Sequence, residues 1–137
     1  RHDPAITVEL FPRDGVHSDD GIGVWLPEAR AVFLGDAFYY QGTSEGRAGR
    51  LLELVERVDA LGAEVFAPGH EREHDAEAFA RLRDHVRGLF AAVEADADQD
   101  VEAIQAAFPL PKALARTTFL DAKTHRRLIQ ALLRERG

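Results

Sequence analysis

Short apolar runs separated by turns, followed by longer helical stripes, most constrain how this chain of 137 residues can fold. Four runs have the length and composition of strands, and they cover residues 6–11, 22–26, 31–34 and 64–67. The first run alternates apolar with polar side chains, which predicts a half-buried strand with its apolar side in the core. The predicted order is therefore strand, strand, strand, helix, strand and then further helices.

Helices are predicted where apolar side chains recur at helical spacing. The first helix covers 51–61 and ends before Gly62, a residue type that commonly follows helix ends. Asp75 is placed to cap the helix after the fourth strand, and Asp100 is placed to cap a shorter helix. A last helix is predicted to start at about Asp121. No repeat, linker or low-complexity tract divides the chain, so we expect one domain.

Composition excludes several classes of protein. The chain has no cysteine, which excludes a disulfide framework, a cysteine-ligated metal site and a cysteine nucleophile. Its formal net charge of −7 disfavours partners such as nucleic acid or an anionic membrane. No run reaches the roughly 18 apolar residues of a membrane span. The chain starts with Arg1 and contains no methionine, which predicts a processed or trimmed piece of a longer protein.

The compartment is less constrained by the sequence. We find no leader that resembles a signal peptide, and a chain without cysteine fits either side of a bacterial inner membrane. Of the two sides, the cytoplasm is favoured. Abundant arginine and alanine indicate a GC-rich, bacterial coding bias.

Three side chains that can bind metal lie in glycine-flanked loops at predicted strand ends. His17 precedes the second strand, Asp36 follows the third, and His70 follows the fourth. Adjacent strands would bring these side chains to one edge of a sheet, and two imidazoles with one carboxylate suit Zn²⁺, Mn²⁺ or Fe. Taken singly, a histidine or aspartate in a turn is more often a cap or a solvated residue.

The sequence around these three residues resembles the second half of the metallo-β-lactamase superfamily. In that family a G-x-H-(S/T) loop leads into a strand, and the next strand ends in G-D. A helix and a further strand ending in P-G-H follow. The matching residues here are Gly15-Val16-His17-Ser18, Gly35-Asp36 and Pro68-Gly69-His70. The resemblance runs from about residue 6 to about residue 93, with all three signatures in family order.

The resemblance implies a fold and a metal centre. The fold would be α/β (α+β), half of a four-layer αββα sandwich with a mixed sheet and flanking helices. Residues 1–137 would be the C-terminal part of a single domain, and 99–137 a helical extension. His17 would bind a first metal ion and His70 a second, while Asp36 would bridge them as the catalytic carboxylate. Two zinc ions are implied, with manganese or iron as alternatives.

The implied function is metal-dependent hydrolysis. In such a centre a metal-bound hydroxide attacks an ester, thioester, lactone, amide or phosphoester, and the metals stabilise the oxyanion that develops. The family's other signature, H-x-H-x-D-H, is absent, because no two of the histidines at 2, 17, 70, 74, 85 and 125 are two residues apart. We therefore expect the N-terminal half that carries this motif as a partner, and this chain alone to be inactive. The alternative is a non-catalytic binding or assembly module with an incomplete site.

Residues beside the three predicted ligands could contribute to the site. Asp19 and Asp20 could orient the preceding imidazole through a hydrogen bond, or form an Asx turn. Tyr39 and Tyr40, which follow the carboxylate, could line a substrate pocket or pack under their loop. His74 could approach a metal ion, and a solvated position at the start of a helix is the alternative.

Other patterns predict structure rather than chemistry. Residues 70–74 match the helical zinc motif H-E-x-x-H, but the Pro-Gly pair before them favours a loop. Residues 96–107 begin like a calcium loop and lack its glycine and final glutamate, so we interpret them as a helix-capping acidic linker. His125 falls on an apolar stripe and is predicted to be a core histidine with its hydrogen bonds satisfied, while His85 is given no role.

Overall fold

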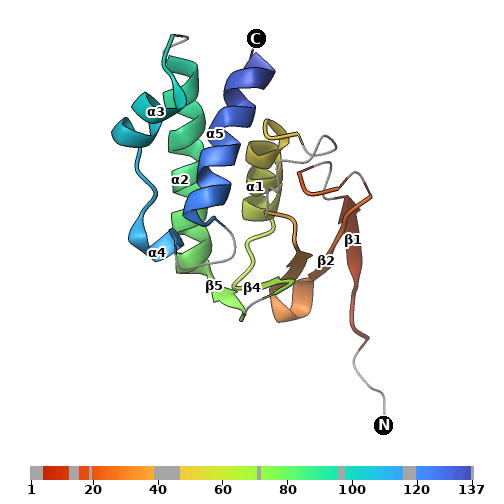
Figure 1. Ribbon diagram of the computed structural model, residues 1–137. Coiled ribbons are helices and arrows are strands. Elements are labelled where there is room, and N and C mark those ends of the chain that lie inside the picture. The colour runs from red at the N-terminus through yellow and green to blue at the C-terminus, as the bar shows by residue number, and fades with distance from the viewer. Residues whose placement is uncertain are drawn as a thin grey trace.

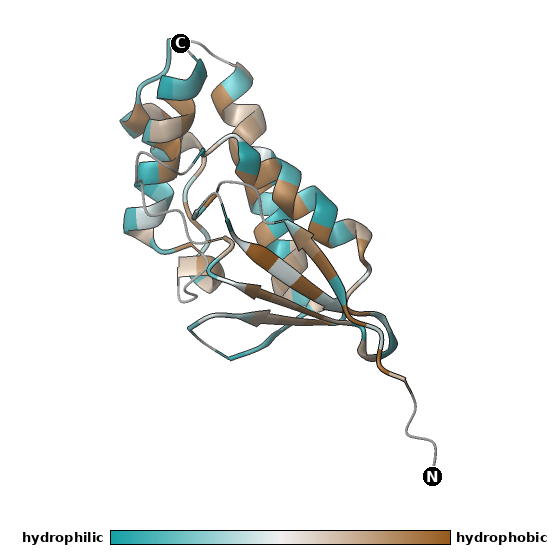
Figure 2. Cartoon of the chain, turned by 90° about the vertical axis from the view of Figure 1, so that its right-hand side faces the viewer, coloured by the Kyte–Doolittle hydropathy of each residue, from teal (hydrophilic) through white to brown (hydrophobic). Residues whose placement is uncertain are grey.

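A five-stranded sheet with helices on one side forms the body of the protein (Figures 1 and 2). The computed structural model describes residues 5–12, 16–18, 20–38, 47–70, 72–95, 98–115 and 120–136. The strands lie side by side in chain order: β1 (Glu9–Pro12), β2 (Ile22–Leu26), β3 (Ala31–Gly35), β4 (Val65–Pro68) and β5 (His74–Asp75). Four of these five match the predicted runs, and the two-residue β5 was not predicted.

The sheet is mixed, because one of its pairs is parallel. β3 and β4 run in parallel, and α1 (Arg50–Ala60) connects them, while all other neighbouring strands are antiparallel. In the parallel pair Gly35 lies opposite Pro68. The residues that follow β3 and β4 therefore leave the sheet at the same edge, which positions the side chains considered below.

The remaining helices cover the sheet and one another. They are α2 (Ala76–Ala95), α3 (Val101–Ala107), α4 (Lys112–Ala115) and α5 (Ala122–Arg136), and the 3-10 helix η1 (Pro27–Ala29) joins β2 to β3. The two predicted N-caps, Asp75 and Asp100, are confirmed: each accepts a backbone N–H bond of 2.8 Å from the residue three positions on. Asp121, where the last helix was predicted to start, caps α5 in the same way, over 2.7 Å. In the part of the chain that the structure describes, no helix is both long and apolar enough to cross a membrane.

The two faces of the sheet differ in what covers them. Val32, Leu34 and Phe66 point to the helices and are at most 2% exposed. On the opposite face, Phe33 and Val65 are 47% and 39% exposed, and no described residue covers them. The core of the protein thus lies between the sheet and the helices, and the other face of the sheet is open.

The predicted burial of the first strand is wrong. Ile6, Val8 and Leu10 are 72%, 56% and 66% exposed. The side chain of β1 that packs against the core is Phe11, which lies over Gly23 so closely that a Cβ there would be 2.3 Å from a ring atom. Alternation fixes the period of a strand and not the direction in which its apolar side points, and here that side belongs to the open face.

Two histidines are buried together between the helices. His125 on α5 is 2% exposed, as predicted for a core residue, and His85 on α2 is 5% exposed. Their ring centroids are 5.1 Å apart, and the ring of Phe108 stacks on His85 at 4.9 Å. Among the described residues, neither Nε2 atom has a hydrogen-bond partner, so the expectation of satisfied hydrogen bonds for His125 is wrong. A hydrogen bond cannot be predicted from the position of a residue on an apolar stripe.

This pair predicts that stability falls in mild acid. Burial, and then the nearby charge of His125, lowers the pKa of His85 to about 4, and burial also lowers the pKa of His125. The unfolded chain takes up protons below pH ~6.5 while the folded chain does not, so stability is lost as the pH falls from ~6.5 toward 4. We expect His85 to account for about 3 kcal/mol of this loss. Urea unfolding of wild type and His85→Leu between pH 7 and 4.5 measures it, and parallel curves would contradict it.

Candidate metal centre

The side chains of His17, Asp36 and His70 lie together at one edge of the sheet. Asp36 directly follows β3 and His70 lies two residues beyond β4, so the parallel pairing of these strands places both at the same edge. His17 lies in the connection between β1 and β2. The sequence predicted that strand order would bring these three residues to a common edge, and the structure has them there.

Both imidazoles face the same carboxylate oxygen. His70 Nε2 lies 3.0 Å from Asp36 Oδ2, at hydrogen-bond distance, and His17 Nε2 lies 4.0 Å from that oxygen. Two ligand atoms bound at 2.0–2.2 Å to the same tetrahedral ion are about 3.4 Å apart. The distances from Asp36 Oδ2 to the His70 and His17 nitrogens, 3.0 and 4.0 Å, lie on either side of this value. The donor types, neutral imidazole nitrogen and carboxylate oxygen, are those that bind Zn²⁺ and similar ions.

The site is open on one side. The side chains of His17 and Asp36 are 24% and 28% exposed, whereas that of His70 is 74% exposed. Asp36 is therefore partly shielded from solvent, whereas His70, which lies within hydrogen-bond distance of it, is largely exposed. Metal binding here would require His70 Nε2 to give up any proton it shares with the carboxylate, which makes affinity dependent on pH.

The three residues are only part of a metal-binding set. Across the described ranges, no group of three or more His, Asp or Glu side chains is arranged to hold a metal ion. Structural and catalytic zinc ions usually take three or four protein ligands each. The two imidazoles and the carboxylate thus fit a metal centre chemically, and a complete centre needs further donors.

A glycine allows the two strand ends to approach each other. The amide of Gly69 donates to the carbonyl of Gly35 over 3.0 Å. A Cβ on Gly69 would lie 2.4 Å from Asp36 Oδ1 and 3.2 Å from the Gly35 carbonyl carbon. The sequence marked Gly69 only as a residue of the loop before His70. Its role in positioning Asp36 depends on the pairing of β3 with β4 and could not be predicted from its neighbours along the chain.

The other predicted site residues have less support. Asp20 is exposed, and Asp19, Tyr39 and Tyr40 lie outside the described residues.

His74 lies in β5, where it is half-buried and opposite Phe66, so the predicted solvated position at a helix start is wrong. Rejection of the helical H-E-x-x-H motif is confirmed, since His70 lies in a bend and His74 in a strand.

Comparison with known proteins supports the fold. No family model matches this sequence, and no curated protein matches it. A metallo-β-lactamase family protein from Thermus thermophilus has a similar structure, with 20% sequence identity and a TM-score of 0.51. All of this chain is covered, and 49% of the Thermus chain.

Two other solved structures match a smaller part of the chain. The DIM-1 metallo-β-lactamase is 21% identical, with a TM-score of 0.49, and the match covers 59% of this chain and 42% of that one. A metallo-β-lactamase from Pontibacter korlensis is 19% identical, with a TM-score of 0.48, and the match covers 60% and 42% of the two chains. This chain thus spans less than half the length of each of these proteins. The predicted fold, half of a metallo-β-lactamase sandwich with a mixed sheet, is confirmed.

Proposed function

We propose that this chain supplies part of the metal centre of a hydrolase. His17 would bind one metal ion, His70 a second, and Asp36 would bridge them. The observation that carries the proposal is the approach of two imidazole nitrogens to one carboxylate oxygen, at 3.0 and 4.0 Å. Zinc is the expected metal, with manganese or iron as alternatives.

The roles of the three side chains follow from their chemistry and exposure. The bound ions would supply an activated water at neutral pH and neutralise charge that develops on the substrate. Asp36 would reduce the repulsion between two cations, and the strand ends would fix its orientation. His70, the most exposed of the three, leaves the solvent side open for substrate. We propose an ester, thioester, lactone, amide or phosphoester as substrate.

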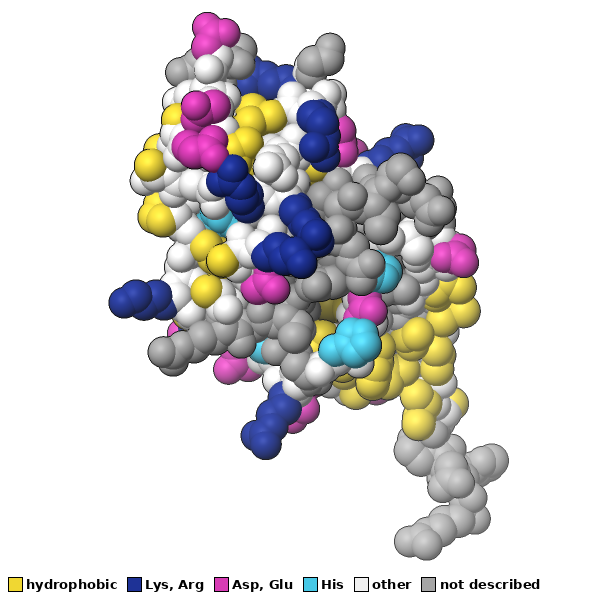
Figure 3. Space-filling view, in the orientation of Figure 1, with side chains coloured by type: hydrophobic (Ala, Val, Ile, Leu, Met, Phe, Trp, Pro, Cys, Tyr) yellow, Lys and Arg dark blue, Asp and Glu magenta, His cyan; other side chains and the backbone are white. Residues whose placement is uncertain are grey.

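We further propose that an N-terminal half with an H-x-H-x-D-H motif completes the centre and covers the open face of the sheet. Large apolar side chains 39–72% exposed gather on β1 to β4 and just before β1: Ile6, Val8, Leu10, Ile22, Phe33 and Val65. Figure 3 shows hydrophobic side chains gathered on the strand side of the molecule, next to histidine and acidic side chains. A contiguous exposed patch of apolar side chains commonly marks a surface that another protein segment covers.

The proposal is tested on the protein completed by its N-terminal half. Metal content and hydrolysis are measured for this protein and for its Asp36→Ala variant. The alternative, a non-catalytic binding or assembly module, is favoured by one observation: the described residues contain no complete metal-binding cluster. That alternative predicts a completed protein without bound metal.

Replacement of Gly69 by alanine is expected to weaken metal binding about 10- to 100-fold, the range typical when the support of a ligand is lost. The added Cβ would overlap Asp36 Oδ1 and push the carboxylate from its place. A matched control is Gly62→Ala, because Gly62 has φ +64° and lies beyond α1, away from the site. The control should lose about 1 kcal/mol of stability and keep its metal affinity. Equal metal affinity in wild type and Gly69→Ala would contradict the positioning role.

A further inference from the structure

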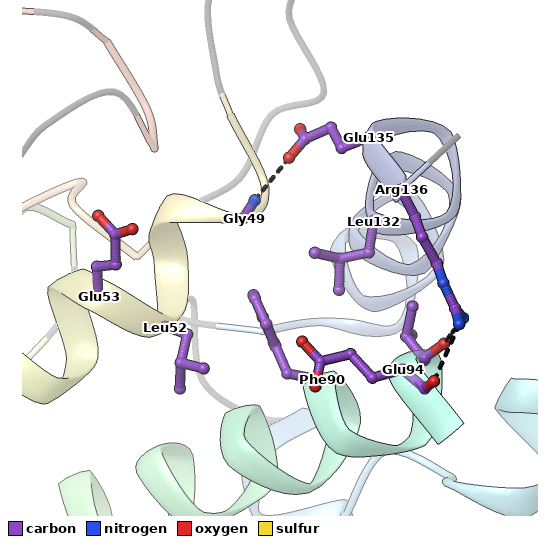
Figure 4. Close-up of a pocket in the computed structure, with 9 residues that line it drawn as sticks. Gly49, Leu52, Glu53, Phe90, Glu94, Leu132, Glu135 and Arg136 are labelled. Carbon is purple, nitrogen blue, oxygen red and sulfur yellow. Dashed lines mark hydrogen bonds between the residues drawn. The ribbon is translucent and has the colours of Figure 1, made fainter. Parts of the chain in front are cut away.

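A hollow of about 410 Å³ lies among the start of α1, the C-terminal half of α2 and the end of α5 (Figure 4). It shares no lining residue with the proposed metal centre. Pockets that bind small ligands commonly enclose roughly 300–1,000 Å³. The size of this hollow is therefore sufficient for a small organic molecule.

The last turn of α5 holds the walls of the hollow in place. The Glu135 carboxylate accepts hydrogen bonds from the amides of Ala48 and Gly49, over 2.7 and 2.8 Å, at the start of α1. The neighbouring Arg136 guanidinium donates to the carbonyls of Val93 and Glu94 at the end of α2. Both charged groups are thus engaged by backbone groups at helix ends, where they complement the helix dipoles.

The interior of the hollow is apolar and its rim is acidic. Leu52, Phe90 and Leu132 contribute apolar surface, and Leu132 is only 7% exposed. Glu53 and Glu94 lie at the rim, and both residues are exposed. Figure 4 shows the Glu94 side chain extending beside Phe90. Within the described residues, neither of these two carboxylates takes part in a hydrogen bond or an ion pair.

We propose that this hollow binds an organic monocation with an apolar body, of the aralkylammonium class. The apolar interior would take up the hydrocarbon part, and the Glu53 and Glu94 carboxylates would attract the ammonium group. The ring of Phe90 offers a further favourable contact for a cation. An anionic ligand would face both carboxylates, while the guanidinium of Arg136 is already bound to backbone carbonyls.

The test compares two probes of the same shape, 4-phenylbutylammonium and 4-phenylbutan-1-ol, on the intact isotope-labelled protein at pH 7 and physiological salt. Binding is followed by NMR chemical shifts. We expect shifts at Leu52, Phe90 and Leu132, and an affinity for the ammonium about five- to tenfold higher than for the alcohol. Equal affinity for the two probes, or no binding of either, would overturn the proposal.

Variants separate the hollow from general attraction to an acidic protein. Glu94→Gln should remove most of the preference for the ammonium and leave binding of the alcohol unchanged. Glu9→Gln removes the same charge from an exposed position on β1 and should change neither affinity. Leu52→Trp should fill the hollow and abolish binding of both probes. If Glu9→Gln weakens ammonium binding as much as Glu94→Gln does, the attraction is non-specific and the proposal fails.

Discussion

Asp36→Ala is expected to remove bound metal and hydrolytic activity together from the completed protein. The Asp36 carboxylate oxygen is the group that both imidazoles approach, at 3.0 and 4.0 Å. Loss of a residue that only hydrogen-bonds to a metal ligand lowers metal affinity or activity about 10- to 100-fold. Loss of the bridging ligand itself should have a larger effect. We therefore expect metal affinity and the rate of hydrolysis each to fall more than about a hundredfold.

The measurement is elemental analysis combined with hydrolysis of a panel of activated esters, thioesters, lactones and phosphoesters. Asp84→Ala is a matched control, because Asp84 is an exposed carboxylate on α2 that pairs with Arg83. The control should keep both its metal and its activity. Metal content that is the same in Asp36→Ala and in wild type would refute the bridging role.

Phe33→Asp is expected to destabilise the completed protein by about 3 kcal/mol or more. Phe33 lies within the open face of the sheet, opposite Val24 on one side and Ala67 on the other, and is 47% exposed in this chain. If another sheet covers this face, the substitution places an unpaired charge in an apolar interface, which is costly.

Urea unfolding of the completed protein measures this effect. Ala60→Asp adds the same charge at an exposed position at the end of α1, and we expect it to cost only about 1 kcal/mol, from helix propensity and the helix dipole. If Phe33→Asp is as mild as this control, the open face is not an interface with the N-terminal half.

Much of the fold could be predicted from the sequence because its local signals are strong. The alternation and length of the apolar runs located β1 to β4, and Asp75 and Asp100 form the expected helix caps. The sequence also placed His17, Asp36 and His70 at strand ends, and the pairing of β3 with β4 brings Asp36 and His70 to one edge.

What could not be predicted depends on packing between distant segments. The exposed side of β1 follows from which face the helices cover, and the alternation of Ile6, Val8 and Leu10 carries no information on this. The burial of His85 arises because α5 and Phe108 cover it. Its spacing from Leu82 and Leu89 places it beside the apolar stripe of α2, but the stripe alone does not show how far the cover extends. The close approach of Gly69 to Asp36 likewise exists only once the two strand ends are paired.

The metal content of the completed protein, determined by elemental analysis beside Asp36→Ala, tests the central claim most directly. The proposal predicts two metal equivalents, with zinc expected, in the wild-type protein and their loss in the variant. A completed protein that binds no metal, or a variant that retains as much as wild type, would contradict it.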